Sequence, residues 1–101
     1  MTTIKDLVLI FQDNTPCFFA RVEALLPDIK PNWWNIYLQI IELDTDNKLL
    51  PVIIWTLHED YVNGSEFTMG GIPMRIDKIP SYSQEELVEE TVQTTVNEKK
   101  K

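Results

Sequence analysis

The segment from Trp33 to Ile40 places the most severe constraint on the fold, because its side chains sort into two sets at every second position. One set is strongly apolar, and the other mixes aromatic rings with amides. Successive strand residues point to opposite faces of a sheet, so the pattern predicts a half-buried strand that runs from Trp33 to about Leu43. The apolar set is Trp34, Ile36, Leu38 and Ile40, and the opposite set is Trp33, Asn35, Tyr37 and Gln39.

Three further segments have the branched and aromatic composition of strands. Leu7 to Phe11 is apolar throughout and Val52 to Leu57 is apolar except at Thr56, and Pro51 stands just before the second segment, where a missing amide donor is tolerated. Cys17 to about Leu25 alternates in the manner of a strand, although its Ala-Arg-Val-Glu-Ala-Leu-Leu portion could also begin a helix. The strand is the preferred interpretation.

A fifth strand is predicted around a pair of glycines. Glu66 to Met69 resumes the strand pattern, Gly70-Gly71 interrupts it, and Ile72 to Ile76 alternates again. Glycines inside a strand often mark a bulge or a sharp bend, which is how a small sheet closes on itself. The interpretation is therefore one bent strand, and it favours a barrel over an open sheet.

Turn residues separate these segments. Asp13-Asn14-Thr15-Pro16, the loop between Pro27 and Pro31, and Asp44 to Lys48 all carry residues that favour turns. The connection from His58 to Ser65 is short, has room for one helical turn, and ends in Asn63-Gly64, a pair that favours positive φ.

These elements predict a mostly β protein: a small antiparallel five-stranded barrel that resembles SH3-like barrels in architecture only. Residues 1–80 form the single barrel domain. Residues 81–101 form an acidic tail that ends in three lysines, and we expect it to be disordered or a short helix. Ser83 and Glu86 have the spacing of a capping box, and Leu87, Val88, Val92 and Val96 form a thin apolar stripe.

The charge of the chain bears on its partners. The formal net charge is −7, and residues 1–80 carry eleven acids against six bases. Binding to nucleic acid draws most of its affinity from Lys and Arg, so a nucleic-acid partner is disfavoured. The single cysteine cannot form an internal disulfide, and neither a secretory signal nor a membrane-spanning apolar run is evident. We expect a soluble, cytoplasmic, acidic protein.

No motif predicts chemistry. Asp44-Thr45-Asp46-Asn47 resembles the start of a calcium loop, but Leu49 and Trp55 occupy the positions that need Gly and Glu. His58 and Cys17 supply at most two ligands, where a structural zinc site needs four. Gly70-Gly71 lacks the companions of a phosphate loop. The sequence therefore predicts neither catalysis, nor a metal, nor a cofactor.

The predicted site is a surface that binds a partner. Residues 7–11 and 52–55 are apolar on both faces, whereas a small barrel has only one interior, so something must cover their outer faces. The tail, a second copy of the chain or another protein are the candidates. Trp33 could be exposed for binding or partly buried under the Pro27 to Pro31 loop. The predicted contact residues are Trp33, Tyr37, Ile53, Trp55 and Tyr61.

The function predicted first is a non-catalytic interaction or self-associating module, with a protein partner or a homodimer. The alternative is a barrel that binds single-stranded nucleic acid. In that case Trp33, Tyr37 and Tyr61 would stack on bases while Arg21, Lys30 and Arg75 met phosphates.

Overall fold

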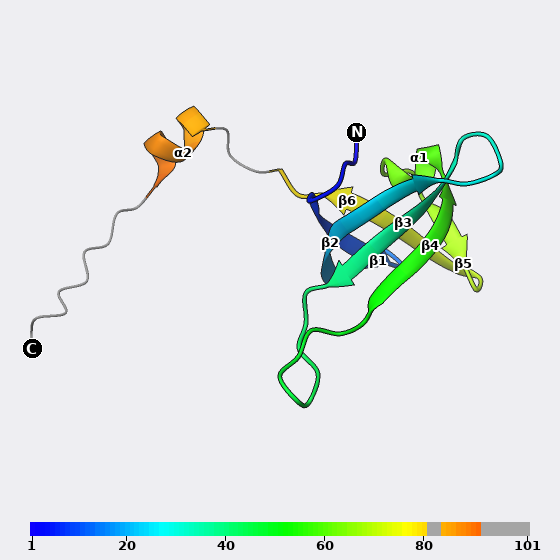
Figure 1. The fold of residues 1–101 in the computed structure, drawn as a ribbon, viewed down its shortest axis with the longest axis horizontal. Coiled ribbons are helices and arrows are strands. Elements are labelled where there is room, and N and C mark those ends of the chain that lie inside the picture. Colours follow the sequence, from blue (N-terminus) through cyan, green and yellow to red (C-terminus); the bar gives the residue numbers. More distant parts are fainter. Residues whose placement is uncertain (81–83, 92–101) are drawn as a thin grey trace, which may run out of the picture.

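The computed structural model describes residues 1–80 and 84–91 and consists of one curled antiparallel sheet with very little helix (Figure 1). The order of its six strands is β4-β3-β2-β1-β6-β5. The strands are β1 (Leu7–Gln12), β2 (Thr15–Pro27), β3 (Trp33–Ile40), β4 (Val52–His58), β5 (Phe67–Met69) and β6 (Ile72–Lys78), and the helices are α1 (Glu59–Val62) and α2 (Gln84–Glu90).

The sheet curls because its longest strand bends. The first part of β2 pairs with β1, and the second part pairs with β3. The pairing with β3 shifts register between Val22 and Ala24, which leaves Glu23 as the extra residue of a bulge. Bulges bend a strand and increase its twist, so this irregularity turns the sheet into a half-barrel. The helical alternative for residues 17–25 is not adopted.

The glycine pair has a different role from the predicted one. Gly70 and Gly71 have φ values of 60° and 82° and form the two-residue turn of a hairpin in which Met69 pairs with Ile72. Two positive φ values in succession are typical of the tight turns that join antiparallel strands. The prediction of one bent strand is therefore wrong: the segment contains β5 and β6, and the sheet has six strands where five were expected.

The other predicted turns are confirmed. Asp13 and Asn14 have φ values of 53° and 62° and join β1 to β2, with Gln12 opposite Thr15. In the loop between β3 and β4, the Asp44 carboxylate accepts hydrogen bonds from the backbone N–H groups of Asp46 and Lys48 at 2.8 and 3.0 Å. The conformation of this acidic loop is therefore stabilised by hydrogen bonds between the Asp44 side chain and the loop backbone.

The hydrophobic core lies on the concave side of the sheet, where the alternation predicted for the third strand is confirmed. Ile36 and Leu38 of β3 are fully buried, and they pack with buried residues of every other strand and of α1. The strand itself ends at Ile40, before the expected Leu43. The buried apolar residues are Val8, Ile10, Ala20, Val22, Ile36, Leu38, Leu57, Val62, Phe67, Met74 and Ile76.

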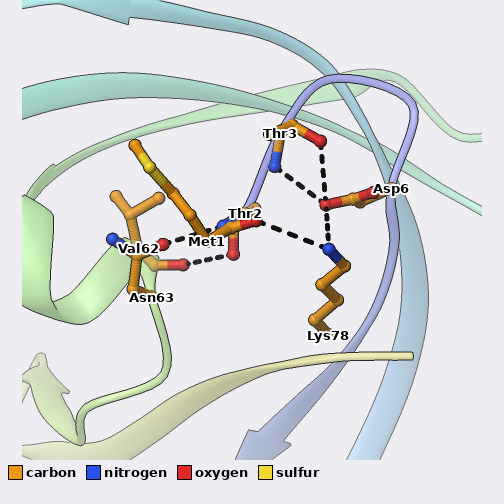
Figure 2. Close-up of polar contacts among 7 residues, drawn as sticks. All are labelled: Met1, Thr2, Thr3, Asp6, Val62, Asn63 and Lys78. Atoms are coloured by element: carbon orange, nitrogen blue, oxygen red, sulfur yellow. Dashed lines mark hydrogen bonds and ion pairs between the residues drawn. The ribbon is translucent and has the colours of Figure 1, made fainter. Parts of the chain in front are cut away.

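The predicted helical turn after β4 is confirmed as α1, and the N-terminal segment anchors it (Figure 2). The Oγ1 atom of Thr2 donates a hydrogen bond to the carbonyl of Val62 at 2.8 Å, and the backbone N–H of Thr2 donates to Oδ1 of Asn63 at 2.8 Å. The last carbonyls of a helix have no partner within it, so Thr2 supplies one from outside. Thr2 is only 3% exposed.

Asp6 extends this anchor to β6. Its Oδ2 atom accepts hydrogen bonds from the backbone N–H and hydroxyl of Thr3, and it lies 3.4 Å from Nζ of Lys78 (Figure 2). The backbone hydrogen bond from Thr3, assisted by Lys78, holds the pKa of the Asp6 carboxyl below its ordinary value of 3.8. The anchor thus joins the N-terminal segment to α1 and to the last strand of the sheet.

Helix α2 stands apart from the sheet (Figure 1). Val88, one residue of the predicted apolar stripe, is 76% exposed, so this side chain does not cover the sheet. Ser83, Val92 and Val96 lie outside the described residues.

Replacing Thr2 with valine tests the anchor. Valine keeps the shape of threonine but cannot donate to the Val62 carbonyl, which stays buried without that partner. We expect Thr2→Val to lower the free energy of unfolding by about 1 to 2 kcal/mol in urea denaturation. Thr68→Val is the matched control, because Thr68 is exposed on β5, and it should change stability little. Equal effects of the two substitutions would contradict the role of Thr2.

A pH series tests the Asp6 carboxylate. A carboxyl whose pKa is lowered by folding adds stability above its unfolded pKa and loses it as the pH falls through the folded pKa. Wild type should therefore exceed Asp6→Asn in unfolding free energy near neutral pH, and the gap should shrink below about pH 3.8. Urea midpoints of both proteins across this range give the measurement. A gap that does not depend on pH would show that the charge on Asp6 has no part in the anchor.

Candidate interaction surface

The convex side of the sheet, called here the outer face, carries large apolar side chains from four strands. Leu9 of β1 lies directly opposite Phe19 of β2, and Tyr37 of β3 lies directly opposite Ile54 of β4. Residues directly opposite in an antiparallel pair point to the same face, so these pairs form rows across the sheet. The apolar outer residues are Leu7, Leu9, Phe11, Phe19, Leu26, Tyr37, Val52 and Ile54, and Ile41 lies beside Phe19.

Several of these side chains are open to solvent. Phe19 is 52% exposed and Ile54 is 54% exposed, while Leu7, Val52 and Ile41 are each more than 40% exposed. Single exposed apolar residues are ordinary on a protein surface. Here they follow one another across neighbouring strands of one face, so they form a cluster instead of scattered single residues.

The charged side chains of the outer face are paired with one another. Arg21 forms an ion pair with Glu23 on the same strand. Arg75 donates to both carboxylate oxygens of Asp77, at 2.8 and 3.2 Å, and its guanidinium lies 4.1 Å from the centre of the Phe11 ring. The hydrogen bonds from Arg75 to Asp77 raise the pKa of the guanidinium. These four charges sum to zero, so the outer face has little electrostatic preference of its own.

The amides between the aromatic residues of β3 are also engaged. Asn35 accepts a hydrogen bond from the Thr56 hydroxyl at 2.6 Å, and Gln39 donates to the carbonyl of Leu50 at 2.6 Å. The first contact holds β3 to β4, and the second holds β3 to the loop that precedes β4. The amides therefore act within the sheet, and apolar contact dominates what the outer face offers a partner.

Trp33 is half-buried at the end of β3. Nζ of Lys30 lies 4.1 Å from the centre of the indole ring, and the His58 ring meets it edge-on at 5.8 Å. Lys30 belongs to the loop between Pro27 and Pro31, so the structure favours the second of the two alternatives, in which this loop partly covers Trp33.

A chain of aromatic contacts on the core side of the sheet bridges the two edge strands, β4 and β5. Trp55 of β4 meets Phe67 of β5 at a centroid distance of 6.1 Å, and Tyr61 of α1 meets Phe67 at 5.5 Å. Tyr61 also contacts His58, 6.0 Å away. Side-chain contacts therefore hold β4 near β5, although the two strands are not hydrogen-bonded to each other in the sheet.

The structure separates the five predicted contact residues. Trp33, Trp55 and Tyr61 belong to the aromatic chain, and Tyr37 lies on the outer face. Ile53 and Trp55 pack against the core, so the outward residues of β4 are Val52 and Ile54. Ile53 and Trp55 are therefore not on the outer face, where we expected them to anchor a partner; β4 is apolar on both faces, so its sequence does not show which residues point outward.

Two prominent outer residues, Phe19 and Ile54, were not among the predicted contacts. The signal for Phe19 was its alternation with Phe18 and Ala20, which the sequence shows but does not orient. The signal for Ile54 was its place in an apolar run. Only the pairing with β1 and β3 decides which alternate residues face outward.

The described residues hold no group of three or more His, Cys, Asp or Glu side chains placed to bind a metal ion. Within the same residues, no helix has the length and apolar character needed to cross a bilayer. Comparisons with protein-family models, curated proteins and solved structures find no match to this chain.

Substitutions of Tyr61 separate packing from hydrogen bonding in the aromatic chain. Tyr61→Ala removes the ring that contacts His58 and Phe67 and should lower the free energy of unfolding by roughly 1 to 3 kcal/mol. Tyr61→Phe keeps the ring and should stay close to wild type in the same urea titration. A loss in Tyr61→Phe as large as in Tyr61→Ala would show that the hydroxyl, not the ring, supports this region.

Proposed function

We propose that this protein is a non-catalytic interaction module that binds a protein partner through the outer face of its sheet. The observation that carries the proposal is the apolar outer face itself, in which exposed Phe19 and Ile54 lie in rows with further apolar residues. Removing such a surface from water stabilises a complex by roughly 25 cal/mol per Å² of apolar area buried.

The arrangement of charges supports the same function. Arg21 and Arg75 are already ion-paired with Glu23 and Asp77, so a partner would not need to bring opposite charges to satisfy them. An interface whose centre is apolar and whose polar groups are satisfied resembles the core of a protein–protein interface.

The finer architecture belongs to the proposal. Leaving β5 aside, the strand order β6-β1-β2-β3-β4, with the short helix α1 following β4, supports an SH3-like barrel to which the β5 hairpin strand is added. Barrels of this kind serve as binding modules, which is an argument by analogy of fold. A cytoplasmic location is part of the same proposal.

The alternative of single-stranded nucleic acid has weaker support. Of the three cations assigned to phosphates, Arg21 and Arg75 are held by carboxylates, and Lys30 lies against the Trp33 ring. Tyr61 contributes its ring to packing against Phe67. Base stacking needs open rings beside free cations, and these positions do not combine the two.

Site-specific photo-crosslinking tests the proposed function. A benzophenone amino acid replaces Phe19 or Tyr37 on the outer face, or Ile29 as a control that is 98% exposed in a loop. We expect the two outer positions to give protein adducts in cells, because only they touch the partner. The control position should give few adducts.

The outcomes separate the classes of partner. Protein adducts that form at positions 19 and 37 in preference to 29 support the proposal, whatever the identity of the partner. Adducts to nucleic acid at these positions would favour the alternative. Equal yields at all three positions would overturn the outer face as an interaction surface.

A further inference from the structure

We infer that two copies of this chain associate by antiparallel pairing of the β4 edge of each copy. This inference goes beyond the proposed function, because the β4 edge is a different surface from the outer face and its pairing leaves that face free for a further partner. It starts from the edges of the sheet, since an edge strand presents unpaired backbone N–H and C=O groups along its free side.

The two edges differ in how well they are protected. β5 has three residues and is followed at once by the Gly70-Gly71 turn, so it offers little to pair with. β4 has seven residues, and no proline or charged residue stands between Val52 and Leu57. Proteins usually protect long edges with charges, prolines or bulges. β4 lacks these devices, which points to an edge that is paired in the working form of the protein.

The β4 sequence is complementary to itself. Antiparallel pairing centred on Ile54 places Ile54 opposite Ile54, Val52 opposite Thr56, and Ile53 opposite Trp55. Each pair combines β-branched or aromatic side chains, the combinations that stabilise antiparallel sheets, and no like charges meet. The alternative centre at Trp55 would place two indole rings opposite each other on the core side, where Trp55 already packs against Phe67.

The charge of the chain favours a second copy at this edge. Two copies with a net charge of −7 repel each other at most surfaces. β4 is uncharged up to Leu57, and the charges of the outer face sum to zero, so the two copies can meet here without placing like charges opposite each other. A basic partner would find no unpaired acid on β4 to select it.

The pairing would also extend the apolar outer face. Ile54 lies opposite Tyr37 within one copy, so joining two β4 strands brings two Tyr37–Ile54 pairs into one continuous row. The exposed Val52 side chain would pack beside Thr56 of the second copy. The dimer therefore brings the two Ile54 side chains, the most exposed apolar residues of β4, into contact with each other.

Sedimentation of the full chain tests this inference, with Ile54→Lys and Phe19→Lys as a matched pair. The two side chains have nearly equal exposure, at 54% and 52%, but only Ile54 lies on the proposed pairing strand. We expect wild type to dimerise as its concentration rises. Ile54→Lys should weaken the dimer by roughly tenfold or more, equivalent to about 1.4 kcal/mol, and Phe19→Lys should leave it nearly unchanged.

Disulfide formation gives a second measurement, which reports the register of the pairing directly. In a Cys17→Ser background, Ile54→Cys should crosslink two copies on oxidation, because opposite residues of an antiparallel pair have Cα atoms about 4.5 to 5.5 Å apart, within disulfide range. Phe19→Cys is the control. Circular dichroism of each variant checks that the sheet is retained.

The outcomes are decisive for the inference and separable from the proposed function. A wild-type chain that stays monomeric, or crosslinking at position 19 in preference to 54, would overturn the β4 dimer. In that case, photo-adducts to a different protein from positions 19 and 37 would still support an interaction module. A β4 dimer whose outer face gives no preferential adducts to any further protein would restrict the function to self-association.

Discussion

A single curled sheet encloses only one core, and most of this structure follows from that limit. Strands β1 and β4 are apolar at nearly every position, but only their alternate residues reach the concave side. Ile10 and Leu57 are buried there, while Leu9, Val52 and Ile54 must lie on the outer face. The apolar outer face is thus a direct consequence of strand composition and pleating, and several of its side chains are open to solvent.

The curl of the sheet is maintained by a bulge in a central strand and by side-chain contacts between the two edge strands. The bulge at Glu23 bends β2, and the aromatic chain that includes Trp55, Tyr61 and Phe67 holds the edge strands near each other. The hydrogen bonds of Thr2 then fix α1, which carries Tyr61, against the N-terminal segment. Together these contacts leave β4 as the longer of the two edge strands of the sheet.

Local patterns in the sequence predict the strands and turns well, because pleating and turn chemistry act over a few residues. The faces of the Trp33 to Ile40 strand and the turn at Asp13-Asn14 are examples. Gly70-Gly71 was misassigned because glycine permits both a bulge and a hairpin turn, and only the pairing of Phe67 with Met74 distinguishes them. The contact between Thr2 and Val62 joins residues 60 positions apart and leaves no local signal.

The candidate site was predictable in kind but not in its individual residues. A strand with one polar face reveals its orientation, whereas β4 is apolar on both faces, so the choice between Ile53 and Ile54 depends on its pairing with β3. The aromatic residues singled out by their size, Trp55 and Tyr61, serve packing at the gap between the edge strands. Large rings are as useful for closing a small core as for binding, and sequence alone does not separate the two uses.

Hydrogen–deuterium exchange of the β4 amides at low and high protein concentration tests the central claim most directly. Edge pairing would place hydrogen bonds on the free side of β4, so the amides that point away from β3 should become more protected as the concentration rises. The amides of β5, at the other edge, should not change. Exchange rates in β4 that are the same at both concentrations would contradict the account.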